Sequence, residues 1–261
     1  MLSSARPVLG VVCVGNYQDS GRPKFESTGR PTHCVCLVTL HRGTERQHLI
    51  VDVGFGRKGP IGPVLFPSDS SSTSGPITSH PLLRGEEWRI RRPAKGELPP
   101  PREGLEQEWL VGHPLSNKPG EEGYVMEHRL VGKGKNGPVE GEWETLYVFS
   151  THERTDLESF QGLSDDVFKG KEGFTTKFRD HLTCSRVYRV ERGRAHPLSL
   201  ADGLSGGGAG GARLARLALT DMEVSSFETT EAGKGQKDKL ERFQSEEERK
   251  KQLKGLFGLD V

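Results

Sequence analysis

A histidine and an aspartate are the residues of this chain best placed for chemistry. His33 begins the apolar segment His-Cys-Val-Cys-Leu-Val, and Asp52 follows the apolar segment His-Leu-Ile-Val. If these segments are adjacent antiparallel strands, the imidazole and the carboxylate lie side by side, and the carboxylate fixes the imidazole tautomer. A carboxylate that closes an apolar strand is also costly to bury without a partner. The two residues are therefore predicted to be the base and the orienting carboxylate of a catalytic triad.

The residues around this pair resemble a known family. Thr-His-x-x-x-Leu-Val around His33, followed by Asp-Val-Gly-Phe-Gly from Asp52, is similar to the arylamine N-acetyltransferases. These cysteine enzymes move an acetyl group from acetyl-CoA to an aromatic amine or hydrazine. The resemblance implies a Cys-His-Asp triad, acetyl-CoA as the co-substrate and no metal. It also implies that Phe55 lines the substrate site, while Gly54 and Gly56 let the backbone bend and approach the acyl-CoA.

The nucleophile of such a triad is harder to find. In the family it lies in an Arg-Gly-Gly-x-Cys segment well before the histidine, and His33 is too near the start of this sequence to leave room for that segment. The four cysteines are Cys13, Cys34, Cys36 and Cys184, and none of them has these neighbours. We therefore expect an N-terminally truncated member of the family that is inactive by itself. Its serine-rich and glycine-rich insertions resemble those of fungal members.

Strand periodicity limits what the cysteines can do. Successive side chains of a strand point to opposite faces, so Cys34 and Cys36 should point away from His33. They are predicted neither to serve as its nucleophile nor to form a metal site with it, and no Cys-x-x-Cys pair completes a tetrahedral set. Cys13 lies between two valines in an apolar run, where burial should leave its thiol unreactive.

The composition bounds the broad class of protein. The 261 residues carry a formal net charge of +1, which gives no overall attraction to nucleic acid or to anionic membranes. No apolar run approaches the ~20 residues that a membrane span needs. Four scattered cysteines without a disulfide spacing suit a reducing compartment. We expect a cytoplasmic protein that handles a small-molecule arylamine and an acyl-CoA, and neither nucleic acid nor a membrane.

The first half of the chain has the pattern of short strands separated by turn residues. The predicted strands are Val8–Val14, His33–Leu40, Gln47–Val53, Glu87–Arg91, Glu108–Val111, Tyr124–Val131 and Thr145–Phe149. Gly43 suits a hairpin loop over residues 41–46. Pro67–Pro81 and Arg92–Pro101 are predicted loops, and the first is expected to be an insertion without fixed structure. Repeated short strands of this kind favour an antiparallel barrel or sandwich.

The second half is expected to mix helices and strands. The predicted elements are a helical segment at Asp156–Phe178, strands at Leu182–Val190 and Ala212–Leu219, and a flexible link at Gly203–Gly211. Ser245 and Glu248 form a capping box for a C-terminal helix, whose apolar stripe is Leu253, Leu256 and Phe257 and whose C-terminal cap is Gly258. The mixed charges of Lys234–Lys254 indicate a solvated helix face.

The predicted fold class is α+β. Residues 1–150 form an antiparallel β-barrel that carries the histidine and the aspartate, and residues 151–261 form an α/β lid. The resemblance covers residues 31–56 strongly, and it implies that the family's N-terminal helical bundle is largely missing. Weaker support comes from the Trp-x-x-x-Tyr-x-Phe segment that begins at Trp143 and from the C-terminal helix. Two other interpretations stay open: another Cys-His-Asp enzyme of the transglutaminase or cysteine-protease kind, and an inactive relative that binds CoA or a partner.

Overall fold

The computed structural model describes somewhat more than half of the chain. The described residues are 2–12, 33–52, 54–56, 58–68, 73–80, 83–94, 97–98, 123–134, 137–153, 183–191, 194–197, 213–220, 223–229 and 235–254. They belong to two compact units. The first is made of Met1–Thr78, Glu87–Arg129 and Glu142–Arg179, and the second of Ser79–Glu86, Leu130–Gly141 and Asp180–Val261.

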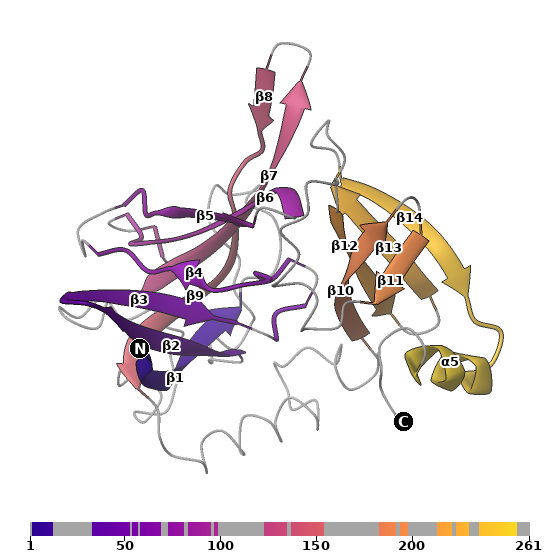
Figure 1. The fold of residues 1–261 in the computed structure, drawn as a ribbon, viewed down its shortest axis with the longest axis horizontal. Helices are drawn as coiled ribbons and strands as arrows, with labels where there is room; N and C mark the ends of the chain where they lie inside the picture. The colour runs from indigo at the N-terminus through magenta and orange to yellow at the C-terminus, as the bar shows by residue number, and fades with distance from the viewer. Residues whose placement is uncertain are drawn as a thin grey trace. The chain divides into compact units, whose positions relative to one another are not determined.

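Most of the described first half is one nine-stranded sheet (Figure 1). Its strands are β1 (Leu2–Val12), β2 (His33–Arg42), β3 (Glu45–Val51), β4 (Val64–Leu65), β5 (Ile77–His80), β6 (Leu83–Arg91), β7 (Tyr124–Gly134), β8 (Gly137–Glu140) and β9 (Glu144–Glu153). They lie in the order β4-β3-β2-β1-β9-β7-β6-β5, with β8 paired to β7. The pairs β1–β2, β1–β9, β2–β3, β3–β4, β7–β8 and β7–β9 are antiparallel.

The two ends of this sheet come together. β4 and β5 are the end strands, and the backbone N–H of Leu65 in β4 donates to the Thr78 hydroxyl in β5 at 3.1 Å. The sheet is therefore a nearly closed antiparallel barrel, which confirms the barrel half of the predicted fold class. This contact uses the side chain of Thr78. In the strand order, β4 and β5 stand at opposite ends and are not paired through their backbones.

A tight hairpin joins β2 to β3. Arg42 pairs with Glu45, so only Gly43 and Thr44 form the turn, and Gly43 has a φ of 65°. Two-residue hairpin turns need positive φ, which glycine adopts at no steric cost. The predicted loop over residues 41–46 is thus shorter than expected, because His41 and Arg46 pair as well and extend both strands. The short turn fixes the register of the two strands that carry the predicted catalytic residues.

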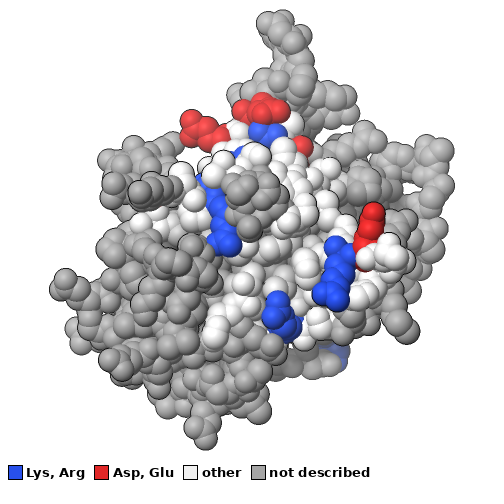
Figure 2. Space-filling model, turned by 90° about the vertical axis from the view of Figure 1, so that its left-hand side faces the viewer, with Lys and Arg blue, Asp and Glu red and all other residues white. Residues whose placement is uncertain are grey.

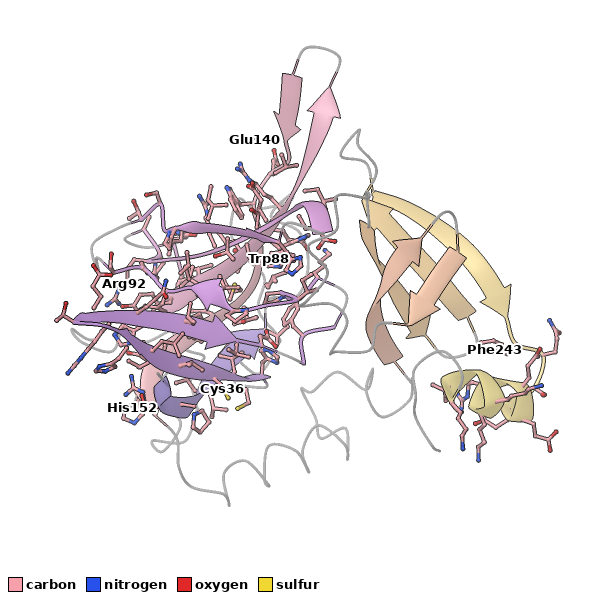
Figure 3. The ribbon with its side chains drawn as sticks, in the orientation of Figure 1. Cys36, Trp88, Arg92, Glu140, His152 and Phe243 are labelled. Carbon is pink, nitrogen blue, oxygen red and sulfur yellow. The ribbon has the colours of Figure 1, made fainter. Side chains whose placement is uncertain are left out.

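The barrel core follows the strand alternation. Val35 and Leu37 of β2 are buried, whereas Cys34 and Cys36 between them are exposed. Figure 3 shows the Cys36 side chain on the outside of the sheet. β7 and β9 differ, because consecutive residues are buried over 124–129 and 145–150. These two strands therefore have no exposed face over these residues. Their buried side chains are apolar over 124–126 and 146–149, and polar or charged over 127–129 and at 145 and 150.

One predicted loop contains a strand. Pro67–Pro81 was expected to lack fixed structure, but Ile77–His80 forms the end strand β5. The serine and proline content hides this strand, since an end strand with only one neighbour needs few buried residues, and Ile77 is 48% exposed. The chain rejoins the barrel just before it. Gly75 has a φ of 58°, and a Cβ built there would lie 2.0 Å from the Ile90 carbonyl oxygen, so only glycine fits.

The second sheet has five antiparallel strands. They are β10 (Thr183–Glu191), β11 (Arg194–Pro197), β12 (Arg213–Thr220), β13 (Glu223–Thr229) and β14 (Gly235–Arg242), in the order β11-β10-β12-β13-β14. The predicted strands at 182–190 and 212–219 are confirmed within one residue at each end. The predicted helix face over Lys234–Lys254 is wrong for its first half, where β14 lies. Mixed charge carries no period, and residues of opposite charge such as Glu223 and Arg242 can occupy opposite positions in the backbone register of two strands.

The C-terminal helix begins as its sequence predicts. In α5 (Glu246–Gln252) the Ser245 hydroxyl accepts from the Glu248 N–H at 3.2 Å. The Glu248 carboxylate accepts in return from the Gln244 N–H at 2.8 Å. Leu253 is buried, as the apolar stripe predicts. No helix in the described part of the chain is long and apolar enough to cross a membrane.

Several predictions fall on residues that the structure does not describe. These are the helical segment 156–178, the glycine-rich link 203–211, the strand 108–111, Cys13, and the end of the C-terminal helix at Leu256, Phe257 and Gly258.

The charged side chains of the described residues are spread over the surface. On the face in Figure 2, the Lys and Arg side chains form separate groups between uncharged atoms, with a few acidic side chains beside them.

Candidate active site

His33 and Asp52 meet where β2 begins and β3 ends. β2 pairs with β3 in antiparallel fashion, and Cys36 lies opposite Val51. Continued by one residue, this register places Asp52 opposite Val35, on the same face as His33. The His33 Nε2 and the Asp52 Oδ2 are 2.9 Å apart. The prediction that these two side chains lie within hydrogen-bond distance on neighbouring antiparallel strands is confirmed.

The Asp52 carboxylate is fully engaged and shielded from water. Its side chain is 0% exposed, against 11% for His33. The second oxygen, Oδ1, accepts from the backbone N–H groups of Gly54 at 3.0 Å and Phe55 at 3.2 Å. Burial alone would raise the pKa of Asp52, but the hydrogen bond and the charge of His33, together with the Gly54 N–H and Tyr147, outweigh it and lower that pKa. Asp52 is therefore an ionised acceptor.

This arrangement determines which nitrogen of His33 is basic. An ionised carboxylate only accepts hydrogen bonds, so Nε2 of His33 must be the donor. In a neutral imidazole the other nitrogen, Nδ1, then carries the lone pair. Nδ1 is the atom of this site that can take a proton from a reacting group. The bond to Asp52 also stabilises the imidazolium that results.

Two aromatic rings enclose the imidazole. The Phe55 ring meets it edge-on, with ring centroids 5.3 Å apart and an interplanar angle of 80°. The Tyr147 ring is tilted against it at 4.8 Å. Phe55 and Tyr147 also contact each other at 5.2 Å. Phe55 is half-buried, and Gly56 behind it has a φ of 81° that favours glycine. Gly54 and Gly56 are both exposed.

Tyr147 belongs to this site, although the sequence did not single it out. Its hydroxyl is buried near the Asp52 carboxylate and has no hydrogen-bond partner of regular geometry among the described residues. Burial, and then the charge of Asp52, raise the pKa of Tyr147 well above its ordinary value, so the phenol stays neutral. Gly10 makes room for it, because a Cβ there would lie 3.3 Å from the Tyr147 ring. The sequence signal that includes Tyr147 is the Trp-x-x-x-Tyr-x-Phe segment that begins at Trp143. This segment does not indicate that β9 pairs with β1.

The described cysteines lie on the other side of the sheet. Cys34 and Cys36 are both free and exposed on β2, which confirms that they face away from His33. Burial of part of the thiol raises the pKa of Cys34, and the nearby Cys36 and Asp52 add to this. Neither thiol is placed to react through His33. Within the described ranges, no three His, Cys, Asp or Glu side chains group closely enough to hold a metal ion.

The lowered pKa of Asp52 predicts a pH-dependent stability. Because its folded pKa lies below the unfolded value of about 3.9, Asp52 stabilises the fold above that value, and this contribution is lost as the pH falls toward the folded pKa. Urea unfolding should therefore show a larger stability difference between the native chain and Asp52→Asn at pH 7 than at pH 3. A difference that stays constant over this range would contradict the prediction.

Comparison with known proteins bears on the fold. No family model and no curated protein matches this sequence. Solved structures are similar. The arylamine N-acetyltransferase of Mycobacterium marinum matches with a TM-score of 0.53 and 19% sequence identity over 99% of this chain and 63% of that one. A cysteine-to-glutamine variant of the Mycobacterium smegmatis N-arylamine acetyltransferase matches with a TM-score of 0.52 and 17% identity, over 98% and 62% of the two chains.

The chain thus spans less than two thirds of the length of either of these structures. At this level of identity the similarity concerns the path of the backbone. It extends over nearly all of the present chain, in agreement with the resemblance of the residues around His33 and Asp52. The chain has the fold of the arylamine N-acetyltransferases.

Proposed function

We propose that this protein takes part in acyl transfer from acetyl-CoA to an aromatic amine or hydrazine. One observation carries the proposal: a buried, ionised Asp52 holds His33 with Nδ1 as its basic atom, in an arylamine N-acetyltransferase fold. An imidazole held in this way is suited to activate a thiol and to stabilise the resulting ion pair. The substrates are small molecules, and the protein acts in the cytoplasm without a metal.

The proposed reaction has two steps. A cysteine thiol gives its proton to Nδ1 of His33 as its sulfur attacks the thioester carbonyl of acetyl-CoA. The carbon–sulfur bond to CoA breaks, and CoA leaves as a thiol with the proton returned by His33. The amine nitrogen then attacks the carbonyl of the acyl-cysteine and gives a proton to Nδ1. The bond between that carbonyl and the cysteine sulfur breaks, the acetylated amine leaves, and His33 returns the proton to the thiolate.

The other residues have proposed roles in binding. Phe55 lies edge-on to His33 and offers an apolar surface to a planar aromatic amine. Gly54 and Gly56 carry no side chain at an exposed stretch of backbone, where acetyl-CoA can come close. In this proposal residues 1–150 form the barrel domain that carries the site, and residues 151–261 form the lid.

The nucleophile is the part of the reaction that the described residues do not supply. Cys34 and Cys36 are on the outer face of β2, and the structure describes neither Cys13 nor the side chain of Cys184. We expect no acetyl-CoA-dependent acetylation of an aminophenol by the chain as it stands. An extended form that carries an Arg-Gly-Gly-x-Cys segment before Met1 should gain turnover. The measurement is acetyl-CoA consumption by both forms.

His33→Ala is the control for this experiment. It should abolish turnover by the extended form and leave the inactive chain unchanged. Turnover by the present chain that His33→Ala removes would show that one of its own cysteines serves as the nucleophile. Cys13→Ser and Cys184→Ser would then identify which.

A second candidate is a relative that binds acetyl-CoA without turnover. The outward position of both described cysteines favours it. Calorimetric titration with CoA separates the two functions, since binding without acetylation by the extended form supports the second and excludes the first. Loss of binding in both forms excludes both.

A further inference from the structure

The turn that carries Phe55 is held from its far end by Lys58. The backbone carbonyl of Lys58 accepts from the indole Nε1 of Trp88, in β6, at 2.9 Å. The ammonium group of Lys58 pairs with the carboxylate of Glu144, the first residue of β9. One residue of the turn is therefore tied to two strands of the barrel, one contact through its backbone and the other through its side chain.

The two ties differ in strength. Trp88, labelled in Figure 3, is only 1% exposed, so the indole N–H that it donates to Lys58 is shielded from water. The side chains of Lys58 and Glu144 are 37% and 31% exposed. Solvent and salt weaken an ion pair at such a site, whereas a buried N–H that loses its acceptor finds no water to replace it. Trp88 is therefore the stronger tie.

The turn packs tightly onto Phe55. Gly59 donates its N–H to the Gly56 carbonyl at 3.2 Å, which folds the chain back on itself. A Cβ built on Gly59 would lie 2.9 Å from the Phe55 Cβ, closer than real side chains approach. At the near end, the N–H groups of Gly54 and Phe55 bind Asp52. Along the chain, Phe55 thus lies between Asp52 and Lys58. Asp52 binds the N–H groups at one end of the turn, and Trp88 and Glu144 bind Lys58 at the other.

We infer that Trp88, with Glu144 as a weaker aid, is a positioning residue for the site: by holding Lys58, it keeps the Phe55 ring edge-on to His33. This inference rests on the proposed function for its catalytic meaning. Phe55 also covers the His33–Asp52 pair, in keeping with the low exposure of both side chains. A displaced Phe55 would admit water to Asp52 and alter the surface offered to an aromatic acceptor.

The test uses nuclear magnetic resonance on the chain as it is. Trp88→Phe keeps an aromatic ring in the core and removes the indole N–H, together with part of the buried indole, so it also leaves a small cavity. It should speed exchange of the Gly54 and Phe55 amide protons about tenfold and move the His33 ring-proton signals, which sense the Phe55 ring. Glu144→Gln should speed the same exchange by no more than about twofold.

The matched control is Thr39→Val. It removes another part-buried hydrogen bond of the barrel, between the Thr39 hydroxyl and His48 at 3.0 Å. It should leave the Gly54 and Phe55 exchange rates and the His33 signals unchanged at comparable overall stability.

Gly59→Ala provides a second, independent variant. Its added Cβ would meet Phe55 first, and it should produce changes in the same His33 signals as Trp88→Phe. If Trp88→Phe does not fold, the same readouts decide the question on the chain with a tryptophan analogue at position 88 in which sulfur replaces the indole N–H. Unchanged His33 signals and amide exchange in the folded Trp88 variant would overturn the inference. These readouts need no thiol, acetyl-CoA or amine, so failure of acetylation and failure of positioning are separately visible.

Discussion

Asp52→Asn should lower acetyl transfer by the cysteine-bearing extended form about 10⁴-fold. The reason is the tautomer of His33. Asparagine can turn its NH₂ group toward Nε2, and Nε2 must then accept instead of donate. The proton moves to Nδ1, where it blocks the atom that should receive the thiol proton. The carboxylate charge that stabilises the imidazolium is lost as well.

The measurement is the rate of acetyl-CoA consumption, with Thr39→Val as a control that alters a different histidine hydrogen bond of the same barrel. The nitrogen chemical shifts of His33 report its tautomer without any turnover. They should show the proton on Nε2 in the native chain and on Nδ1 in Asp52→Asn. Transfer within tenfold of the parent form, or an unchanged tautomer, would contradict the assignment of Asp52 as the orienting carboxylate.

Glu127→Ala should destabilise the barrel by about 3–5 kcal/mol. Glu127 in β7 is buried and accepts from the Arg89 Nε at 2.6 Å, the Arg91 Nε at 3.0 Å and the Arg91 Nη2 at 2.7 Å. Burial by itself would lower the pKa of Arg91, but Glu97 and Glu127 outweigh this and raise it, so the guanidinium remains charged. Without Glu127, Arg91 keeps the carboxylate of Glu97, and Arg89 loses the carboxylate to which its Nε donates.

Chemical unfolding measures this effect through the denaturant midpoint. Glu144→Gln is the matched control, because it breaks an ion pair whose partners are about one-third exposed and should cost less than about 1 kcal/mol. If Glu127→Ala costs no more than this control, the network contributes nothing beyond ordinary surface pairs.

The hairpin with His33 and Asp52 could be predicted because its information is local. Two apolar segments of strand length are separated by a short glycine-containing connection, and this combination leaves little choice of partner or direction. Strand alternation then placed Cys34 and Cys36 on the outer face. The capping box of α5 is local in the same sense, since Ser245 and Glu248 are three residues apart.

Other parts of the site depend on contacts between distant segments. Tyr147 reaches Asp52 because β9 pairs with β1, and nothing in either segment specifies that neighbour. Glu127 meets Arg89 and Arg91 through the pairing of β7 with β6, across a long intervening segment. Trp88 was expected in a strand, but its bond to the Lys58 carbonyl involves a backbone group that every residue has. Short elements such as β4 were missed because two residues carry no periodicity.

The position at which the barrel closes determines where the chain can accept an insertion. β4 and β5 are joined there by the Leu65 N–H and the Thr78 hydroxyl, and Gly75 marks the point at which the chain rejoins the sheet. A segment grafted between residues 68 and 73 would leave the register of β2 and β3 untouched. The connection between β4 and β5 is therefore the place where we would insert a reporter or an affinity tag, or divide the chain into two complementary fragments.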